Sequence, residues 1–312
     1  MTLCIRKIIF ALTALLVFWM IVPFAQAGNL RIAIMISNDS APYRETLGGF
    51  QEYLRRQGLQ SDFSIYNLND NAMTAEKAVQ EIRKNRAGLI LTLGTLATEA
   101  SLEKIRDMPV VAGLILKANK VNNTDNATGV ILEFPLETQF KMIRRVLPEV
   151  KTVGVIYNPK ENKEMIRAAS KVARDMGLSL DAQEVNTPQD LPPALEKLAN
   201  SADVLWGVAD NLVLTAQTAK HILLFSYRNK IPFIGLSSTW VKSGALYSLD
   251  RDYADIGIQC GEMAIKILQG STAGSIPPAV PRKVIYSVNL KTAQYMKLNI
   301  PEAVIKNAHQ IY

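Results

Sequence analysis

The sequence predicts an α/β protein built from two doubly wound, parallel-sheet lobes. Short apolar runs alternate with segments of helical periodicity along nearly the whole chain, an arrangement typical of parallel strands covered by helices on both faces. The alternation restarts near residue 135, which indicates a second lobe of the same kind. The chain has 312 residues, of which 48% are apolar and 20% charged, enough for cores of normal size.

The first 27 residues precede this pattern and are typical of a secretory signal peptide. Residues 6–7 are basic, residues 8–24 are uncharged and apolar, and residues 25–27 (AQA) form a small-residue cleavage site before Gly28. An uncleaved anchor is the alternative, because the apolar run is near the lower limit for spanning a bilayer. Cys4 precedes the apolar run, so lipidation is not expected. We expect a soluble mature chain that begins at Gly28 in the periplasm.

The first set of elements follows in a regular order. Apolar runs such as LRIAIMI and GLILTL indicate buried strands, and the intervening segments indicate amphipathic helices. The expected strands are 30–36, 62–67, 88–93, 109–114 and 128–132, and the expected helices are 43–57, 74–84 and 95–105.

The second set repeats the alternation. Pro148 and Gly177 each follow an expected helix, and prolines near residue 192 fall in the first turn of another, where they are tolerated. The expected strands are 152–157, 180–185, 204–208, 232–235, 245–249 and 283–288; the expected helices are 136–147, 163–176, 190–200, 212–229, 253–269 and 290–295. The Ser/Thr/Gly/Pro-rich stretch 270–281 is expected to be a connector.

Charge and residue usage exclude several functional classes. Without residues 6–7 the chain has 33 basic and 28 acidic residues, a net charge of +5, and no basic run interleaved with aromatics predicts nucleic-acid binding. Cys260 falls on the apolar face of an expected helix and is assigned to the core. Only His221 and His309 are present, and no GxSxG, HExxH, CxxC or phosphate-binding loop occurs. We therefore expect no catalytic residues, no metal and no cofactor.

Candidate binding residues follow the expected strands, because ligands of open parallel sheets bind outside the carboxyl ends of the strands. They are Asn38 and Tyr43 after the first strand, Gly94 and Thr95 after the third, and, in the second set, Asn158, Asp210, Asn211, Ser237, Ser238 and Asp250.

Each of these positions also has a purely structural interpretation. Gly94 and Thr95 open a helix, so they either present free N–H groups to an anion or serve as an ordinary helix cap. Asp210 either pairs with a ligand ammonium or caps the next helix. Tyr43 and Trp240 either stack on a ligand or pack near the hinge.

Several longer segments resemble one known family. They are LILTLGTLATEAS (89–101), LPEVKTVGVIYNPKEN (147–162), ADNLVL (209–214), KIPFIGLSSTWVKSGAL (230–246), DYADIGIQCGEMAIKILQG (252–270) and VNLKTAQYMKLNIP (288–301). Their order and spacing resemble the ABC-transporter substrate-binding family that contains tryptophan- and phenylalanine-binding members, within the type I periplasmic-binding fold. The loop 37–46 departs from the histidine–proline pattern of the amino-acid-binding members, which leaves the ligand class open.

The resemblance implies an N-terminal lobe of residues 28–134 plus 248–272 and a C-terminal lobe of residues 135–247 plus 273–312. Three chain crossings would join them, and a small polar, amino-acid-like ligand would bind between them. The partners would be the permease and ATPase of an ABC importer, served by a monomer. A periplasmic sensor that signals to a membrane kinase is the first alternative, and an enzyme on a doubly wound fold is the second.

Overall fold

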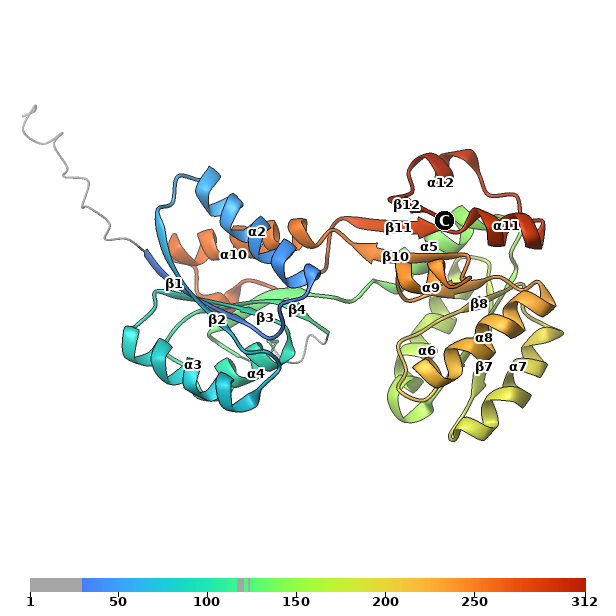
Figure 1. Cartoon of the computed structure of the whole chain (residues 1–312), viewed down its shortest axis with the longest axis horizontal. Helices are drawn as coiled ribbons and strands as arrows, with labels where there is room; N and C mark the ends of the chain where they lie inside the picture. Colours follow the sequence, from blue (N-terminus) through green and yellow to red (C-terminus); the bar gives the residue numbers. More distant parts are fainter. Residues whose placement is uncertain (1–29, 117–120, 123) are drawn as a thin grey trace, which may run out of the picture.

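The computed structural model describes residues 30–116, 121–122 and 124–312 and shows two lobes, each built around its own sheet (Figure 1). Parallel strands dominate both sheets and helices cover both faces, so the predicted fold class is confirmed. The expected signal peptide lies outside the described residues. Within the described ranges, no helix is both long and apolar enough to cross a membrane.

The first lobe contains a five-stranded, fully parallel sheet in the order β2-β1-β3-β4-β5. Its strands are β1 (Leu30–Ile36), β2 (Ser61–Asn67), β3 (Leu89–Leu93), β4 (Val110–Ile115) and β5 (Ala127–Ile131). Its helices are α2 (Ala41–Arg56), α3 (Ala72–Asn85), α4 (Thr95–Lys104) and, from much later in the chain, α10 (Tyr253–Leu268).

Alternating side chains of the central strands fill two separate cores in this lobe. Ile32 and Ile34 of β1 pack with α2 and α10 on one face of the sheet, whereas Ala33 and Met35 pack with α3 and α4 on the other. All four are at most 2% exposed, as expected for a strand covered on both faces. Because both faces of the strand are buried, its run of apolar residues in the sequence is continuous.

Glycines let α10 pack against α2 at backbone distance. A Cβ atom at Gly49 of α2 would lie 2.0 Å from the Ala254 carbonyl oxygen, and one at Gly257 of α10 would lie 2.0 Å from the Thr46 carbonyl oxygen. No side chain other than hydrogen fits either position. This close contact fixes α10, which directly follows a chain crossing, to the first lobe.

The second lobe contains a seven-stranded sheet in the order β12-β11-β10-β9-β8-β6-β7, parallel except for the pair β10–β11. Its strands are β6 (Thr152–Tyr157), β7 (Ser179–Glu184), β8 (Val204–Trp206), β9 (Phe233–Gly235), β10 (Tyr247–Arg251), β11 (Val284–Val288) and β12 (Gln310–Ile311). Its helices are α5 (Leu136–Val146), α6 (Pro159–Asp175), α7 (Leu191–Ala199), α8 (Ala216–Asn229), α9 (Ser238–Lys242), α11 (Leu290–Met296) and α12 (Glu302–Lys306). A 3-10 turn at Pro188–Asp190 precedes α7, and a second one at Ala273–Ser275 follows α10 along the chain.

Three segments join the lobes: β5 to α5, β10 to α10, and the stretch that leads into β11 (Figure 1). Sheet membership differs from the expected lobe boundaries at residues 248 and 273. Strand β10 stays in the second sheet to Arg251. Residues 273–281 lie beside the first sheet, where Ala279 exchanges backbone hydrogen bonds with Gly129 and Ile131 of β5. Sheet membership therefore changes near Asp252 and near Arg282.

Local differences from the expected elements have identifiable causes. Helix α8 begins at Ala216, not at residue 212, because Asp210 closes a turn over the next three residues and Thr215 then caps the helix. Elements α9, α12 and β12 were not expected. Each has five residues or fewer, too short for a hydrophobic period to be recognised.

Candidate functional site

Both sheets direct the carboxyl ends of their parallel strands toward the other lobe. Strand β10 is parallel to β9 and leads directly into α10 of the first lobe, and β5 is parallel to β4 and leads into α5 of the second. Since β6, β8 and β9 run in the same direction as β10, their ends face the first lobe as well. The residues that follow strands in the two lobes therefore face each other (Figure 1).

Gly94 is the centre of a polar cluster on the first lobe. It precedes α4 with a φ of +93°, a conformation that strongly favours glycine. A Cβ atom there would lie 2.6 Å from the Ser37 hydroxyl oxygen and 2.8 Å from the Tyr43 hydroxyl oxygen. The structure thus brings together the candidates Gly94 and Tyr43, and it adds Ser37, which was not among the candidates.

The start of α4 keeps unused hydrogen-bond donors. The Ser37 hydroxyl accepts a hydrogen bond from the Ala97 N–H at 3.0 Å. Thr95 is exposed and follows the cap position, which Gly94 occupies without a side-chain cap. In the described part of the chain, the N–H groups of Thr95 and Leu96 have no acceptor. Ordinary capping by Thr95 is therefore not what the structure contains, and two N–H groups remain available to an electronegative ligand atom.

Asn38 and Tyr43 border this cluster. The Asn38 side-chain amide donates a hydrogen bond to the Asp70 carboxylate at 2.6 Å, so part of its hydrogen-bonding capacity is used inside the lobe. Burial, together with the negative charge of Asp70, raises the pKa of the Tyr43 phenol. Tyr43 therefore stays protonated at neutral pH and can donate a hydrogen bond to a ligand.

Asp210, on the second lobe, accepts four hydrogen bonds from residues of its own lobe. One carboxylate oxygen accepts hydrogen bonds from the Asn158 N–H at 2.7 Å and the Asn162 side-chain amide at 2.8 Å. The other oxygen accepts from the N–H groups of Leu212 and Val213 at 2.9 and 3.0 Å. The side chain is buried and joins the β6–α6 turn to the segment after β8. Of the two interpretations, the structure favours capping, although the capped element is a turn and not α8.

Asn158 and Asn211 lie beside Asp210 and are also used locally. The Asn158 side chain caps α6 by accepting a hydrogen bond from the Lys160 N–H at 3.0 Å. Asn211 donates through its backbone and side chain to one oxygen of Glu161, at 3.3 and 3.1 Å.

Ser237 and Ser238 follow β9, where they begin the short helix α9 and are half-buried. No side-chain hydrogen bond caps α9. Within the described ranges, no hydrogen bond connects these serines, or the Asp210 group, with the Gly94 cluster. The candidates therefore form separate groups on the two lobes.

Asp250 lies at the second chain crossing, between the lobes. One of its carboxylate oxygens accepts hydrogen bonds from the Arg251 N–H at 2.8 Å and the Tyr253 hydroxyl at 3.2 Å. Its second oxygen receives no hydrogen bond from any described residue. Burial and the adjacent Asp250 charge raise the pKa of Tyr253 to about 12, which keeps this phenol a donor.

A cavity of about 90 Å³ lies next to this crossing, at the carboxyl ends of β8 and β9. Its lining includes Phe134, Gln139, Trp206, Leu236 and Arg251, none of which was a candidate. The Arg251 guanidinium lies 4.0 Å above the centre of the Phe134 ring and donates a hydrogen bond to the Leu132 carbonyl of the first crossing. Arg251 ends β10 directly after another charged residue, Asp250, and this pair of charges at the end of a strand is the signal in the sequence that could have identified Arg251.

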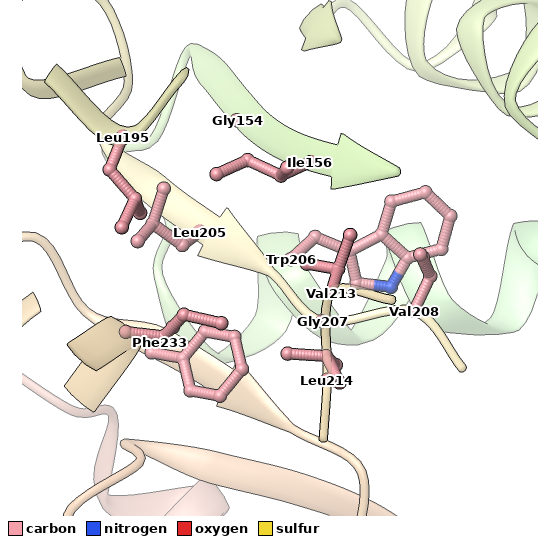
Figure 2. Close-up of a pocket in the computed structure, with 11 residues that line it drawn as sticks. Gly154, Ile156, Leu195, Leu205, Trp206, Gly207, Val208, Val213, Leu214 and Phe233 are labelled. Atoms are coloured by element: carbon pink, nitrogen blue, oxygen red, sulfur yellow. The ribbon is translucent and has the colours of Figure 1, made fainter. Parts of the chain in front are cut away.

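A second cavity, in the interior of the second lobe, is shown in Figure 2. It has a volume of about 20 Å³, and apolar side chains such as Leu195, Leu205 and Phe233 line it. Trp206 also borders it, but the indole N–H is used in a 3.0 Å hydrogen bond to Gln139. Because its lining side chains are apolar and the Trp206 indole N–H is already used, we assign this cavity to imperfect packing of the core and not to ligand binding.

Trp240 packs inside the second lobe. Its ring makes an edge-to-face contact with Phe233, with 5.5 Å between ring centres, and the side chain borders the core beside α7 and α8. The packing interpretation therefore holds for Trp240. Tyr43, which borders the Gly94 cluster, has a different environment and remains a candidate.

The described residues contain no group of three or more His, Cys, Asp or Glu side chains that could hold a metal ion. Cys260 is completely buried in the first lobe, and burial raises the pKa of its thiol to about 12. The thiol is therefore assigned to packing between α10 and the sheet.

Comparison with known proteins identifies the family. The family model described as "ABC transporter substrate binding protein" matches residues 29–312. The tyrosine-binding protein of Clostridioides difficile (strain R20291) is 25% identical over 244 residues, which cover 73% of this chain and 70% of that protein.

Solved structures show the same fold. A ligand-free, open substrate-binding protein from Clostridium difficile matches 90% of this chain and 98% of its own, with a TM-score of 0.78 and 22% identity. A domain from Streptococcus pneumonia in complex with L-Trp matches 91% of this chain and all of its own, with a TM-score of 0.63 and 23% identity. A periplasmic ribose ABC transporter protein from Conexibacter woesei matches 91% of this chain and 98% of its own, with a TM-score of 0.58 and 14% identity.

Proposed function

The chain belongs to the family of ABC transporter substrate binding proteins, and we propose that it binds a small amino-acid-like ligand between its two lobes and delivers it to an ABC importer. Proteins of this family bind substrates and are not enzymes, and they are normally periplasmic or extracellular. We further propose that residues 1–27 are a cleavable signal peptide and that the receptor is a monomer in the periplasm.

The observation that carries this proposal is the contrast between used and unused polar groups at the facing sheet ends. On the first lobe, the N–H groups of Thr95 and Leu96 and the Tyr43 hydroxyl can donate hydrogen bonds. At the crossing, one oxygen of Asp250 can accept one. An amino acid carries both hydrogen-bond acceptors and a cationic ammonium, so it can use both kinds of group. Asp250, and not the saturated Asp210, is then the partner of the ligand ammonium.

The comparisons add support for the ligand class. One relative is a tyrosine-binding protein, and a protein of the same fold was solved with L-Trp. A sugar-type ligand has the weaker case, because the ribose-related protein of this fold is only 14% identical.

Lobe closure is the proposed mechanism. A ligand that contacts donors on the first lobe and acceptors at the crossing stabilises the conformation in which these groups approach each other. The closed conformation would then dock on the permease, and ATP hydrolysis by the partner ATPase would drive release.

Thermal unfolding of residues 28–312 in the presence of each common amino acid, with ribose as a neutral comparison, tests the proposal. A ligand at about 100 times its Kd adds roughly 2.7 kcal/mol to the free energy of unfolding. Stabilisation by one or a few amino acids and none by ribose is the expected result. Stabilisation by ribose alone, or by nothing in the set, would contradict the proposal.

A further inference from the structure

Arg251 carries a charge with which no acidic side chain of the described residues pairs directly. Its Nε atom is buried without a hydrogen-bond partner, and no described Asp or Glu side chain forms an ion pair with its guanidinium. Burial lowers the pKa of Arg251, the direction expected for a cation that has lost water, although Tyr253 and the nearby Asp250 charge act in the opposite direction. Its close contacts are uncharged groups, among them the Leu132 carbonyl oxygen and the ring of Phe134. Burying a cation in this way is costly unless an anion joins it.

Arg282, at the third crossing, is an arginine of the same region whose charge is paired with carboxylates. Its Nε and Nη2 atoms donate to the two oxygens of Asp255 at 2.9 and 3.1 Å. Its Nη1 atom donates to Glu262 at 2.9 and 3.1 Å. Arg282 thus has two carboxylates bonded to its guanidinium, whereas no carboxylate in the described part of the chain bonds to the guanidinium of Arg251.

The cavity beside Arg251 has room for an anionic group. Its volume of about 90 Å³ exceeds the roughly 10–15 Å³ that one water molecule needs. Gln139, also in the lining, is already used, because its amide donates to the Phe134 carbonyl at 3.0 Å and accepts from Trp206. Among the described residues that line the cavity, Arg251 alone is charged, so it is the side chain that can select for the charge of a ligand.

We propose that Arg251 binds a carboxylate of the ligand and thereby restricts the ligand to carboxylic acids, amino acids among them. This inference rests on the proposed function and specifies which group takes the carboxylate. The guanidinium offers a charged, planar set of donors that matches two carboxylate oxygens. The free N–H groups of α4 are uncharged and border exposed Thr95, so they take a second polar group of the ligand. Because Arg251 contacts both the first and second crossings, a bound carboxylate would also tie ligand binding to lobe closure.

The test compares three probes that differ only at the carboxylate: L-tyrosine, L-tyrosinamide and tyramine. Calorimetry gives the Kd of each probe for the wild-type chain and for Arg251→Gln; if another amino acid binds more tightly, its acid, amide and amine replace the tyrosine set. Loss of one partner of a buried charge pair weakens binding by about 30-fold or more. We expect the wild type to prefer the acid by at least this factor, and Arg251→Gln to bind acid and amide about equally.

Two further variants separate ligand recognition from a role in the fold. Arg251→Lys keeps the charge but not the planar fork, so it should fold and keep part of the preference for the acid. Arg282→Gln removes an arginine from two ion pairs, so it should lower the melting temperature and leave the ratio of acid to amide affinity unchanged.

The outcomes distinguish this inference from the proposed function. If Arg251→Gln and Arg251→Lys weaken acid and amide equally, or if the wild type binds both equally, Arg251 does not bind the carboxylate, although the receptor function stands. If the wild type binds no amino acid and no analogue, both the proposed amino-acid-like ligand and the assignment of Arg251 are wrong.

Discussion

At the end of the first sheet, α4 begins with two N–H groups that no described residue accepts; at the end of the second sheet, Asp210 receives four hydrogen bonds from its own lobe. Both places follow a buried parallel strand, and both carry polar residues that are typical of a binding site. The first place offers donors, whereas the second holds two segments of one lobe together. The position of a polar residue therefore says less about its function than the number of partners that it already has.

Replacement of Asp210 tests the structural half of this comparison and has the largest expected effect. Asp210→Ala leaves four donors without their acceptor, so the free energy of unfolding should fall by about 3 kcal/mol in urea denaturation. Asp210→Asn keeps one acceptor oxygen and should lose roughly half as much. A ligand Kd that rises sharply while stability stays at the wild-type value would show that Asp210 binds the ligand after all.

Replacement of Gly94 tests the binding half. Gly94→Ala adds a methyl group between the hydroxyls of Ser37 and Tyr43, at a φ of +93°, and should lower the free energy of unfolding by about 2 kcal/mol. It should also weaken ligand binding by about tenfold or more. Gly244→Ala is the matched control, because Gly244 has a φ of +121° and a Cβ atom added there would meet no other atom within 4 Å. The control should lose stability and keep the Kd; equal losses of affinity in both would refute a special role of Gly94.

Removal of the Tyr43 hydroxyl sharpens the assignment at the same cluster. Tyr43→Phe keeps the ring and removes one donor, so the Kd should rise about fivefold, the effect of roughly 1 kcal/mol from one hydrogen bond. The melting temperature of the unliganded chain should change little, because in the described residues no hydrogen bond within the protein uses this hydroxyl. An unchanged Kd measured by calorimetry would assign Tyr43 to packing.

Alkaline unfolding compares the crossing with the second lobe. Burial raises the pKa of both Tyr253 and Tyr157 to about 12, above the ordinary value of 10. Between pH 10 and 12 the unfolded chain releases these protons while the folded chain holds them, so stability should be complete below pH 10 and fall as the pH rises to 12. Tyr253→Phe and Tyr157→Phe should each make the fall in melting temperature shallower. If the melting temperatures of both variants fell with pH as steeply as that of the wild type, burial of these phenols would be contradicted.

The fold could be predicted from the sequence because its signal is local. Strands such as β1 and β3 are runs of apolar residues, and such a run indicates by itself that both faces of the strand are buried. Short elements such as α9 and β12 could not be predicted, because they depend on neighbours brought close by the rest of the fold. The later start of α8 has a similar cause, since it depends on how Asp210 closes the preceding turn.

The candidate site was predictable in position but not in role. Gly94 and Tyr43 were expected from their places after strands, and the structure brings them together. The role of Asp210 was left open, because two of its donors come from residues 158 and 162, about fifty positions away. Arg251 was not among the candidates, because its lack of an ion pair with any described acidic side chain becomes visible only in the packed structure.

The most direct test of binding between the lobes is the distance between them with and without ligand. Cysteines at exposed Lys77 of α3 and Lys163 of α6 would carry spin labels, and the buried Cys260 thiol would not react. We expect the amino acid with the lowest Kd to shorten the mean distance between the labels, and Gly94→Ala to need more ligand for the same change. A distance distribution that saturating ligand leaves unchanged, with binding confirmed by calorimetry in the same sample, would contradict closure of the lobes on the ligand.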